Sequence, residues 1–180
     1  ALRYNTTGTN NVAIGHEAGL SNTTGAGNSA VGKTTLQSNT TGANNTAVGL
    51  QALNGNTTAA DNTAVGMNAL VTNTTGASNT AVGRSALQES TTASRNTAVG
   101  YQAGYSNTTG IENTFVGRGA ANANTTGQHN AVFGDFAYGA GSTGSYNTAI
   151  GKNALRFNTT ASSNTAVGYK AGYSNTTGTL

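Results

Sequence analysis

Residues 27 to 34 read GNSAVGKT and match the phosphate-binding pattern G-x-x-x-x-G-K-[ST] at every fixed position. Where this pattern binds a nucleotide, the loop follows a strand and opens a helix, so that backbone amides and the helix N-terminus hold the phosphates. Lys33 would then reach the outer phosphates and Thr34 would bind magnesium. The pattern indicates a nucleotide site only if a helix follows it.

Candidate acid–base and metal-ligating side chains are few. The five acidic residues and two histidines are Glu17, Asp61, Glu89, Glu112, Asp135, His16 and His129. His16 and Glu17 are adjacent, and adjacent side chains of an extended chain point to opposite faces. No acid–base pair recurs in the sequence. We therefore predict no catalytic, cofactor-binding or metal-binding residues and expect that the protein is not an enzyme.

The elements that would have to position such residues follow from an unusual composition. Gly, Asn and Thr supply 84 of the 180 residues, and charged residues make up 7%, against roughly 25% in average globular proteins. The absence of Cys excludes disulfides and thiolate metal sites. The net charge of +3 comes from eight basic residues that occur singly, so no nucleic-acid-binding patch is predicted. No apolar run approaches the roughly 18 residues of a membrane span, and we expect no direct membrane insertion.

A strict 17-residue period organises the whole sequence. The unit reads N-T-A-V-G-x-x-A-L-x-x-N-T-T-G-x-x, and its first Asn, first Gly and last Thr never change. The invariant Gly recurs every 17 residues from Gly15 to Gly168 without an insertion. We predict a single repeat domain over residues 1–180, with a partial repeat at 1–10 and ten full repeats at 11–180. Because the sequence starts in mid-unit, we interpret it as a slice of a longer fibre.

The period also accounts for the phosphate-loop pattern. Ala30, Val31 and Gly32 are the ordinary A-V-G of the second repeat, and other residue types occupy the position of Lys33 in the other repeats. Each repeat contains several Gly, Asn and Thr residues, which disfavour a helix. We therefore predict that no nucleotide binds.

Short strands and tight turns fit the repeat. T-A-V alternates outward, inward and outward faces in a pleated strand, and the Gly after it allows a positive φ. A second extended segment is expected from the Ala-Leu pair to the Thr-Thr pair, before a turn at Gly25 and its equivalents. This predicts an all-β fold, a parallel β-solenoid (β-roll) of about ten 17-residue coils. At about 4.8 Å per coil the rod would be roughly 50 Å long.

Stacking gives each repeated residue type a role. The Asn column that begins at Asn11 is expected to form a ladder of side-chain amides, and the Thr columns to pair hydroxyls between coils. Val and Leu columns are expected to form a narrow core. Where Gly replaces the Leu, as at Gly104, the bulky residue is expected to shift by one place, to Tyr105. Because this core is thin, we expect a homo-oligomer in which small Ala columns allow chains to approach closely.

The segment NNVAIG at residues 10 to 15 resembles the N-S-V-A-I-G head repeat of YadA-like trimeric autotransporter adhesins. The unit NTAVG-x-x-AL-x-x-NTTG is also similar to repeats in the shafts of tail-fibre-type proteins. The resemblance spans the whole chain and implies a left-handed parallel β-roll with three chains side by side, outside the cell or on a virion. The unit is longer than the usual head repeat, and Thr mostly replaces its first Val.

Two groups of residues are candidates for contacts beyond the fold. The least regular stretch, residues 111 to 146, carries Phe115, Phe133, Phe136 and Tyr138, which form a candidate receptor-contact patch or belong to a coil repacked with larger side chains. The candidate N-glycan acceptors are Asn5, Asn22, Asn39, Asn44, Asn56, Asn73, Asn107, Asn124, Asn158 and Asn175. The favoured interpretation of these Asn residues is turns and ladders, because stacked glycans would crowd one another.

The sequence as a whole predicts a structural or adhesive extracellular fibre module on a cell or virion surface. It would serve as a rigid spacer and attachment surface, with further copies of itself and a surface glycan or host receptor as partners. One alternative is a subunit of a self-assembling extracellular filament whose open coil ends stack. An ice-binding β-solenoid is a second alternative, raised by the Thr-rich repeat.

Overall fold

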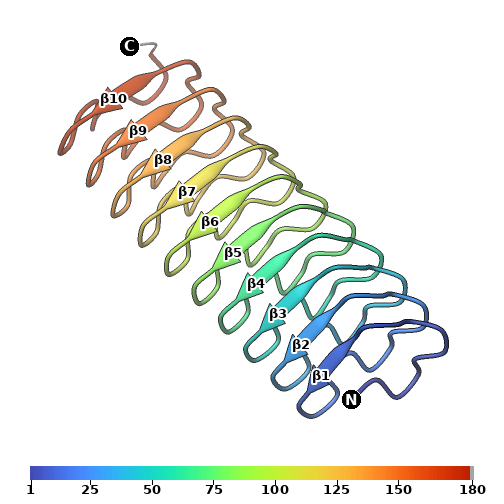
Figure 1. Cartoon of the computed structure of the whole chain (residues 1–180). Helices are drawn as coiled ribbons and strands as arrows, with labels where there is room; N and C mark the ends of the chain where they lie inside the picture. The colour runs from blue at the N-terminus through green and yellow to red at the C-terminus, as the bar shows by residue number, and fades with distance from the viewer. Residues whose placement is uncertain (179–180) are drawn as a thin grey trace.

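The structure, a computed structural model, describes residues 1–178. The chain winds into a rod of stacked coils with its two termini at opposite ends (Figure 1). One three-residue strand occurs in each coil, and residues 1–178 contain no helix. The strands are β1 (Val12–Ile14), β2 (Ser29–Val31), β3 (Thr46–Val48), β4 (Thr63–Val65), β5 (Thr80–Val82), β6 (Thr97–Val99), β7 (Thr114–Val116), β8 (Ala131–Phe133), β9 (Thr148–Ile150) and β10 (Thr165–Val167). The predicted all-β parallel solenoid with 17-residue spacing is confirmed.

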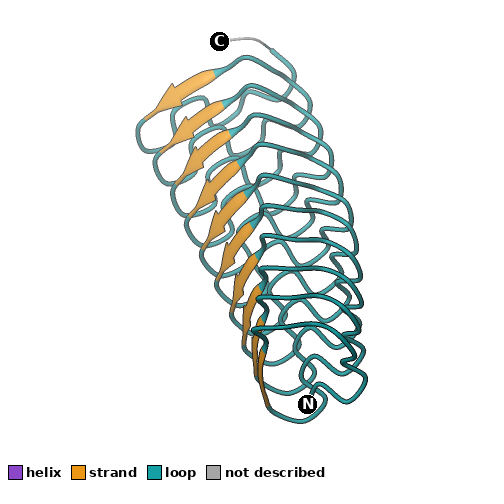
Figure 2. Ribbon diagram, turned by 45° about the vertical axis from the view of Figure 1, so that its right-hand side comes forward, coloured by secondary structure: helices purple, strands orange, loops and turns teal. Residues whose placement is uncertain are grey.

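All ten strands form one parallel sheet in chain order, along one side of the rod (Figure 2). The register pairs Thr46 with Thr63 and Ala47 with Ala64, and every other pair is also 17 residues apart. Since this offset equals the sequence period, equivalent residues stack into columns that run along the rod.

The predicted second strand of each coil is wrong. The segment after T-A-V-G is a series of turns and bends throughout residues 1–178. In the third coil Gln51 has φ 60° and Leu53 has φ 50°, and a left-handed backbone cannot continue a pleat. Neighbouring coils still bond there, because the N–H of Leu53 donates to the carbonyl of Ala69 at 3.0 Å.

The invariant Gly after each strand is explained by close approach as well as by φ. Gly66 has φ 134°, and a Cβ on it would lie 2.6 Å from both carbonyl atoms of Gly83 in the next coil. Any side chain would therefore separate the coils or break the turn.

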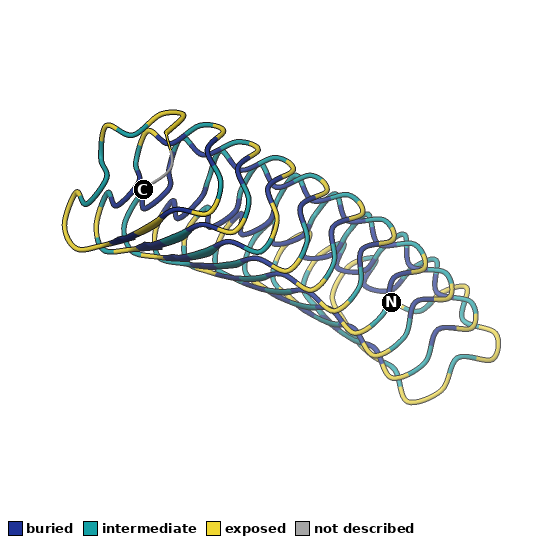
Figure 3. Cartoon of the chain, turned by 90° about the horizontal axis from the view of Figure 1, so that it is seen from above, coloured by how far each residue is buried: buried dark blue, intermediate teal, exposed yellow. Residues whose placement is uncertain are grey.

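The core is built mainly from Ala and Leu, and the Val of T-A-V lies outside it. The middle residue of each strand, such as Ala64, points inward, and Ala69 and Leu70 of the same coil complete the buried interior. Figure 3 shows that buried segments, in dark blue, recur from coil to coil along the rod. The alternation of T-A-V is as predicted, so Val65 points outward and adds nothing to the core. The expected use of Ala columns between chains is also wrong, because these Ala side chains are buried inside the chain.

The predicted Asn ladder is confirmed. In one representative step, the backbone N–H and the Nδ2 of Asn62 both donate to Oδ1 of Asn45, at 3.0 and 3.3 Å. Nδ2 of Asn62 also donates to the carbonyl of Gly76 at 2.9 Å, which ties the start of the coil to its end. These amides are buried, so each bond replaces one that water can no longer supply.

The first Asn of each N-T-T forms a second buried ladder. Asn56 donates from Nδ2 to Oδ1 of Asn39 at 2.8 Å and to the carbonyl of Ala59 at 3.0 Å. The hydroxyl of Thr57 donates to the carbonyl of Thr74 at 3.1 Å, so this Thr column bonds to backbone and not to other hydroxyls. The ladder is interrupted at Ser90, whose Oγ has no partner.

Phe115 replaces an inward Ala and is completely buried. A Cβ on Gly104 would lie 2.5 Å from Cδ2 of Phe115, so the ring occupies space next to a coil that lacks the usual Leu. Tyr105, the expected substitute, is only half-buried. The missing Leu is therefore compensated from the strand of the next coil, not by a shift along the chain.

Tyr138 makes a second compensation of this kind. Its ring fills the position that a side chain on Gly141 would occupy, and Gly141 stands where the second ladder needs an Asn. The phenol oxygen donates to the carbonyl of Gly144 at 3.1 Å, which is the bond that an Asn at 141 would supply. It also accepts from Nδ2 of Asn147 at 3.2 Å. Burial raises the pKa of Tyr138 to about 12.

Candidate interaction surfaces

The outward face of the sheet is a regular array of two columns. The first residue of each strand, usually Thr, is mostly half-buried, and the third, usually Val, is more exposed, with Val65 at 36% and Ile150 at 40%. Along a strand the two outward side chains are about 6.6 Å apart, and neighbouring strands are about 4.8 Å apart. Ten strands thus expose a continuous apolar stripe, which on a folded protein usually marks a contact surface.

The phosphate-loop segment lacks the geometry for a phosphate. Its centre is strand β2, where the N–H of Ser29 donates to the carbonyl of Asn45 at 2.8 Å and that of Gly32 to Ile14 at 2.8 Å. These amides are therefore committed to the neighbouring coils. The Oγ1 of Thr34 donates to the carbonyl of Lys33 at 2.8 Å.

The column formed by the residues two places before each strand brings together charged residues that are far apart in the sequence. Arg95 pairs with Glu112 at 2.6 Å, and Nδ1 of His129 lies 3.0 Å from the other carboxylate oxygen of Glu112. The His129 ring stacks on Tyr146 with centroids 4.8 Å apart. Sequence reasoning missed this set, although the spacing of 17 between its members was the available signal. The pairs lie on the surface, where each contributes about 0 to 1 kcal/mol.

A second column gathers basic residues. Arg118 donates to Asp135 through Nε at 2.7 Å and Nη2 at 3.1 Å, and Lys152 lies 3.8 Å from the same carboxylate. The hydrogen bond from Arg118 holds the pKa of Asp135 below its ordinary value, so this carboxylate stays charged. Among residues 1–178, His, Asp and Glu form no group of three that could hold a metal ion.

The predicted aromatic patch is not assembled on the surface. Phe115 and Tyr138 have no exposed area and belong to the core. Phe133 extends the outward stripe of the sheet and is 39% exposed, while Phe136 is half-buried on a turn. The interpretation as a receptor-contact patch therefore does not hold for Phe115 and Tyr138. The alternative, a coil repacked with larger side chains, describes them, because each ring fills a local deficit in the core.

The glycan candidates are largely buried. Seven of them take part in the second ladder with their amides inside the rod, namely Asn22, Asn39, Asn56, Asn73, Asn107, Asn124 and Asn158. The amide nitrogen that would carry a glycan is thus already a hydrogen-bond donor. Asn5 and Asn175 are half-buried and also donate to backbone carbonyls, and Asn44 is exposed.

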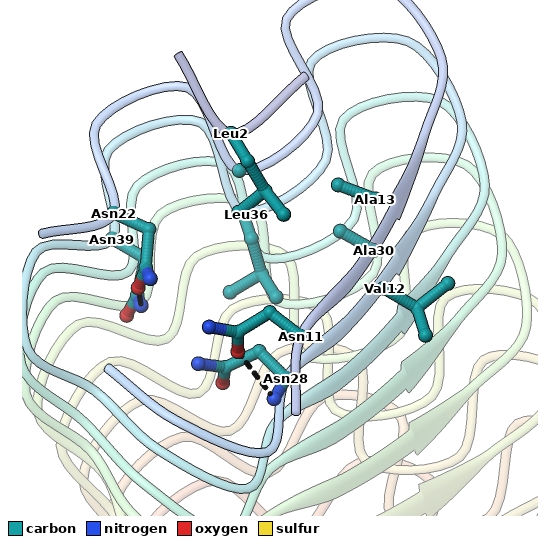
Figure 4. Close-up of a pocket in the computed structure, with 10 residues that line it drawn as sticks. Leu2, Asn11, Val12, Ala13, Asn22, Asn28, Ala30, Leu36 and Asn39 are labelled. Carbon is teal, nitrogen blue, oxygen red and sulfur yellow. Dashed lines mark hydrogen bonds between the residues drawn. The ribbon is translucent and has the colours of Figure 1, made fainter. Parts of the chain in front are cut away.

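A small apolar cavity lies inside the first coils. It is lined by Leu2, Asn11, Val12, Ala13, Gly19, Asn22, Asn28, Ala30, Leu36 and Asn39. Figure 4 shows Leu2 and Leu36 facing Ala13 and Ala30 across it. Gly19 occupies the Leu column, so the cavity lies where the Leu side chain of the regular repeat is missing, and Cδ2 of Leu2 comes within 3.1 Å of the position of its Cβ. Its lining has no acid, base or nucleophile and supports no chemistry.

No family model, curated protein or solved structure matches this chain. Within residues 1–178 there is also no helix of the length and apolarity that crossing a membrane requires.

Proposed function

We propose that the protein is a structural and adhesive fibre module that works outside the cell, on a cell or virion surface. The observation that carries the proposal is the outward apolar stripe on a rod with termini at opposite ends (Figure 1). Such a rod separates whatever lies at its two ends, and its stripe provides a lateral contact with further copies of itself. The resemblance to adhesin heads and tail-fibre shafts supports three chains side by side, each a left-handed roll.

Lateral association fits the chemistry of the sheet face. The Val column is apolar and lies on a surface where every strand repeats the same contact, so a second copy could be bound along the whole rod. The interior of each coil is mostly methyl groups and Leu, which leaves little apolar area buried within one chain. Covering the stripe would add apolar burial at roughly 25 cal/mol per Å².

The test is the mass in solution of the parent chain and of two triple variants. In the stripe variant, Val65, Val82 and Val99 become Glu. In the matched control, the exposed Thr58, Thr75 and Thr92 on another side of the rod become Glu. Multi-angle light scattering should give about three times 17.8 kDa for the parent and the control, and 17.8 kDa for the stripe variant. A folded parent that is monomeric would refute lateral association through the stripe, and so would a trimeric stripe variant.

The same experiment addresses end-to-end filaments. Scattering mass that rises with concentration, together with long fibres in electron micrographs, would favour stacking of open coil ends over a closed trimer. In that case the stripe variant should still elongate, because the ends and not the sheet face make the contact.

Ice binding is a second candidate, favoured by the regular spacing of Thr and Val columns on the sheet face. A flat lattice of hydroxyls and methyls can order water, but only if the face is uncovered. Ice-recrystallisation inhibition that the stripe variant loses and the control keeps would support it. Inactivity of a monomeric parent would exclude it.

A further inference from the structure

Three of the eight basic residues, Arg118, Lys152 and Arg156, gather around Asp135 and Phe136. Residues 1–113 contain four basic and four acidic residues, whereas residues 114–180 contain Arg118, Lys152, Arg156 and Lys170 against one acid, Asp135. The whole net charge of +3 therefore belongs to the last coils. We call Arg118, Asp135, Phe136, Lys152 and Arg156 the cationic cluster.

The ring of Phe136 organises this cluster. The guanidinium carbons of Arg118 and Arg156 lie 5.0 and 4.5 Å from its centroid, within the range of cation–π attraction. Two glycines make the room: a Cβ on Gly119 would lie 2.5 Å from Cε1 of Phe136, and one on Gly139 would lie 2.5 Å from Nη1 of Arg156. The cluster thus depends on Gly119 and Gly139, which stand where most other repeats have a side chain and which let the ring and Arg156 lie close to the backbone.

Its charge is only partly neutralised inside the protein. Asp135 is shared by Arg118 and Lys152, while no carboxylate among residues 1–178 lies within ion-pair distance of Arg156. The side chains of Arg118 and Lys152 are 61% and 60% exposed. Three cations against one anion leave a local charge of +2 that faces solvent and attracts anions.

The column that contains Arg118, Asp135 and Lys152 runs along the rod and also includes two Tyr rings. Tyr101, Arg118, Asp135, Lys152 and Tyr169 follow one another at equivalent positions of five successive coils. The two cations are thus about 10 Å apart and the outer Tyr rings about 19 Å apart along the rod. Both rings are exposed, Tyr101 at 45% and Tyr169 at 68%. Each ring has one flanking cation, with Cζ of Arg84 5.9 Å from the Tyr101 centroid and Nζ of Lys170 5.3 Å from the Tyr169 centroid. The exposed part of each ring can pack on the apolar face of a sugar, and the cations along the column would bind acidic groups.

We propose that the column from Tyr101 to Tyr169, together with Arg156, binds a linear polysaccharide that carries carboxylate or sulfate groups. The proposal rests on the attachment role proposed above and names the ligand class of that surface. A nucleic acid fits less well, because single strands are held by rings that stack on successive bases, and this column has no ring between its cations. The ring of Phe136 is half-buried and has guanidinium carbons at 5.0 and 4.5 Å from its centroid, so it cannot serve as a platform.

The test is binding of a fluorescent heparin oligosaccharide, measured by anisotropy at physiological salt. In the cluster variant, Arg118, Lys152 and Arg156 become Gln. In the control variant, Arg3, Lys33 and Arg95 become Gln, which removes the same charge elsewhere. We expect the parent and the control to bind alike, the cluster variant to bind at least about tenfold more weakly, and neutral dextran not to bind. Binding of the parent should weaken as salt rises.

Three results would overturn the proposal: no heparin binding by the parent, equal loss in both variants, or tighter binding of a single-stranded DNA oligonucleotide than of heparin. Light scattering on the same samples separates this proposal from the fibre proposal. A trimeric parent that ignores heparin refutes only the ligand, whereas a monomeric parent that binds heparin through the cluster refutes only the trimeric fibre.

Discussion

The replacement of the missing Leu at Gly104 by the ring of Phe115 can be tested by restoring the residues of the regular repeat. The first change is Phe115→Ala, which gives β7 the usual inward residue. The second is Gly104→Leu, which gives the preceding coil its usual Leu. The backbone should accept this Leu, because Leu53, Leu70 and Leu87 hold φ between 50° and 52° at equivalent positions and Gly104 has φ 60°.

Each single change should destabilise the protein. Phe115 has no exposed area, and truncating a buried Phe to Ala costs about 3 to 5 kcal/mol. Adding Leu at 104 while Phe115 remains forces atoms into an occupied site, since even the first side-chain carbon would lie 2.5 Å from the ring. Such overpacking costs about 1 to 3 kcal/mol or more.

The double variant should recover much of this loss, because the new Leu fills the space that the ring leaves. The next coil has Ala121 in place of Leu, so recovery should be partial. We expect a favourable coupling free energy of at least about 2 kcal/mol in the double-mutant cycle.

The assay combines guanidinium denaturation, followed by circular dichroism, with amide hydrogen exchange, because coils of a repeat array can open locally. The informative amides are those of Gly104 and Ala121, which donate to Ala120 and Ala137 at 2.9 Å. The amide of Leu36 serves as a remote control. If the losses of the two single variants simply add in the double variant, Phe115 does not replace the missing Leu.

Three further predictions concern the ladders and Tyr138. Asn62→Ala should cost about 2 to 4 kcal/mol in guanidinium denaturation, because it leaves the buried N–H and Nδ2 of Asn79 without their shared acceptor; a loss below 1 kcal/mol would contradict a structural ladder. Ser90→Asn should raise the free energy of unfolding by about 1 to 2 kcal/mol, because it continues the second ladder. Gly141→Asn should lower it, because the ring of Tyr138 fills that site. Equal effects of the two variants would show that the ring is not an obstacle. The pKa of Tyr138 is raised from 10.0 to about 12, so the folded state keeps the phenol proton to higher pH than the unfolded state does. The contribution of this proton to the free energy of unfolding is therefore complete below pH 10. It is lost, by about 3 kcal/mol in all, as pH rises to 12. Tyr138→Phe should remove this part of the alkaline decline in denaturation curves, and an unchanged decline would place the pKa shift elsewhere.

The sequence alone determined the period, and the period determined the register. Identical repeats can stack only in phase, so the columns, the Asn ladder through Asn45 and Asn62 and a positive φ at Gly66 could be predicted. The close approach of Gly66 to Gly83 of the next coil appears only in the folded rod. The same rule would have predicted the Arg95, Glu112 and His129 column, had charged residues been compared at a spacing of 17.

The tertiary structure decided which columns are inside. The path of the coil depends on left-handed residues such as Gln51 and Leu53, whose types do not signal a positive φ as Gly does. These turns replace the expected second strand and enclose an interior filled mainly by Ala and Leu, whereas Val65 lies on the outward face that the T-A-V alternation predicts. Phe115 is buried for the same reason, because core space is shared between coils and only the folded rod shows where Gly104 leaves it empty.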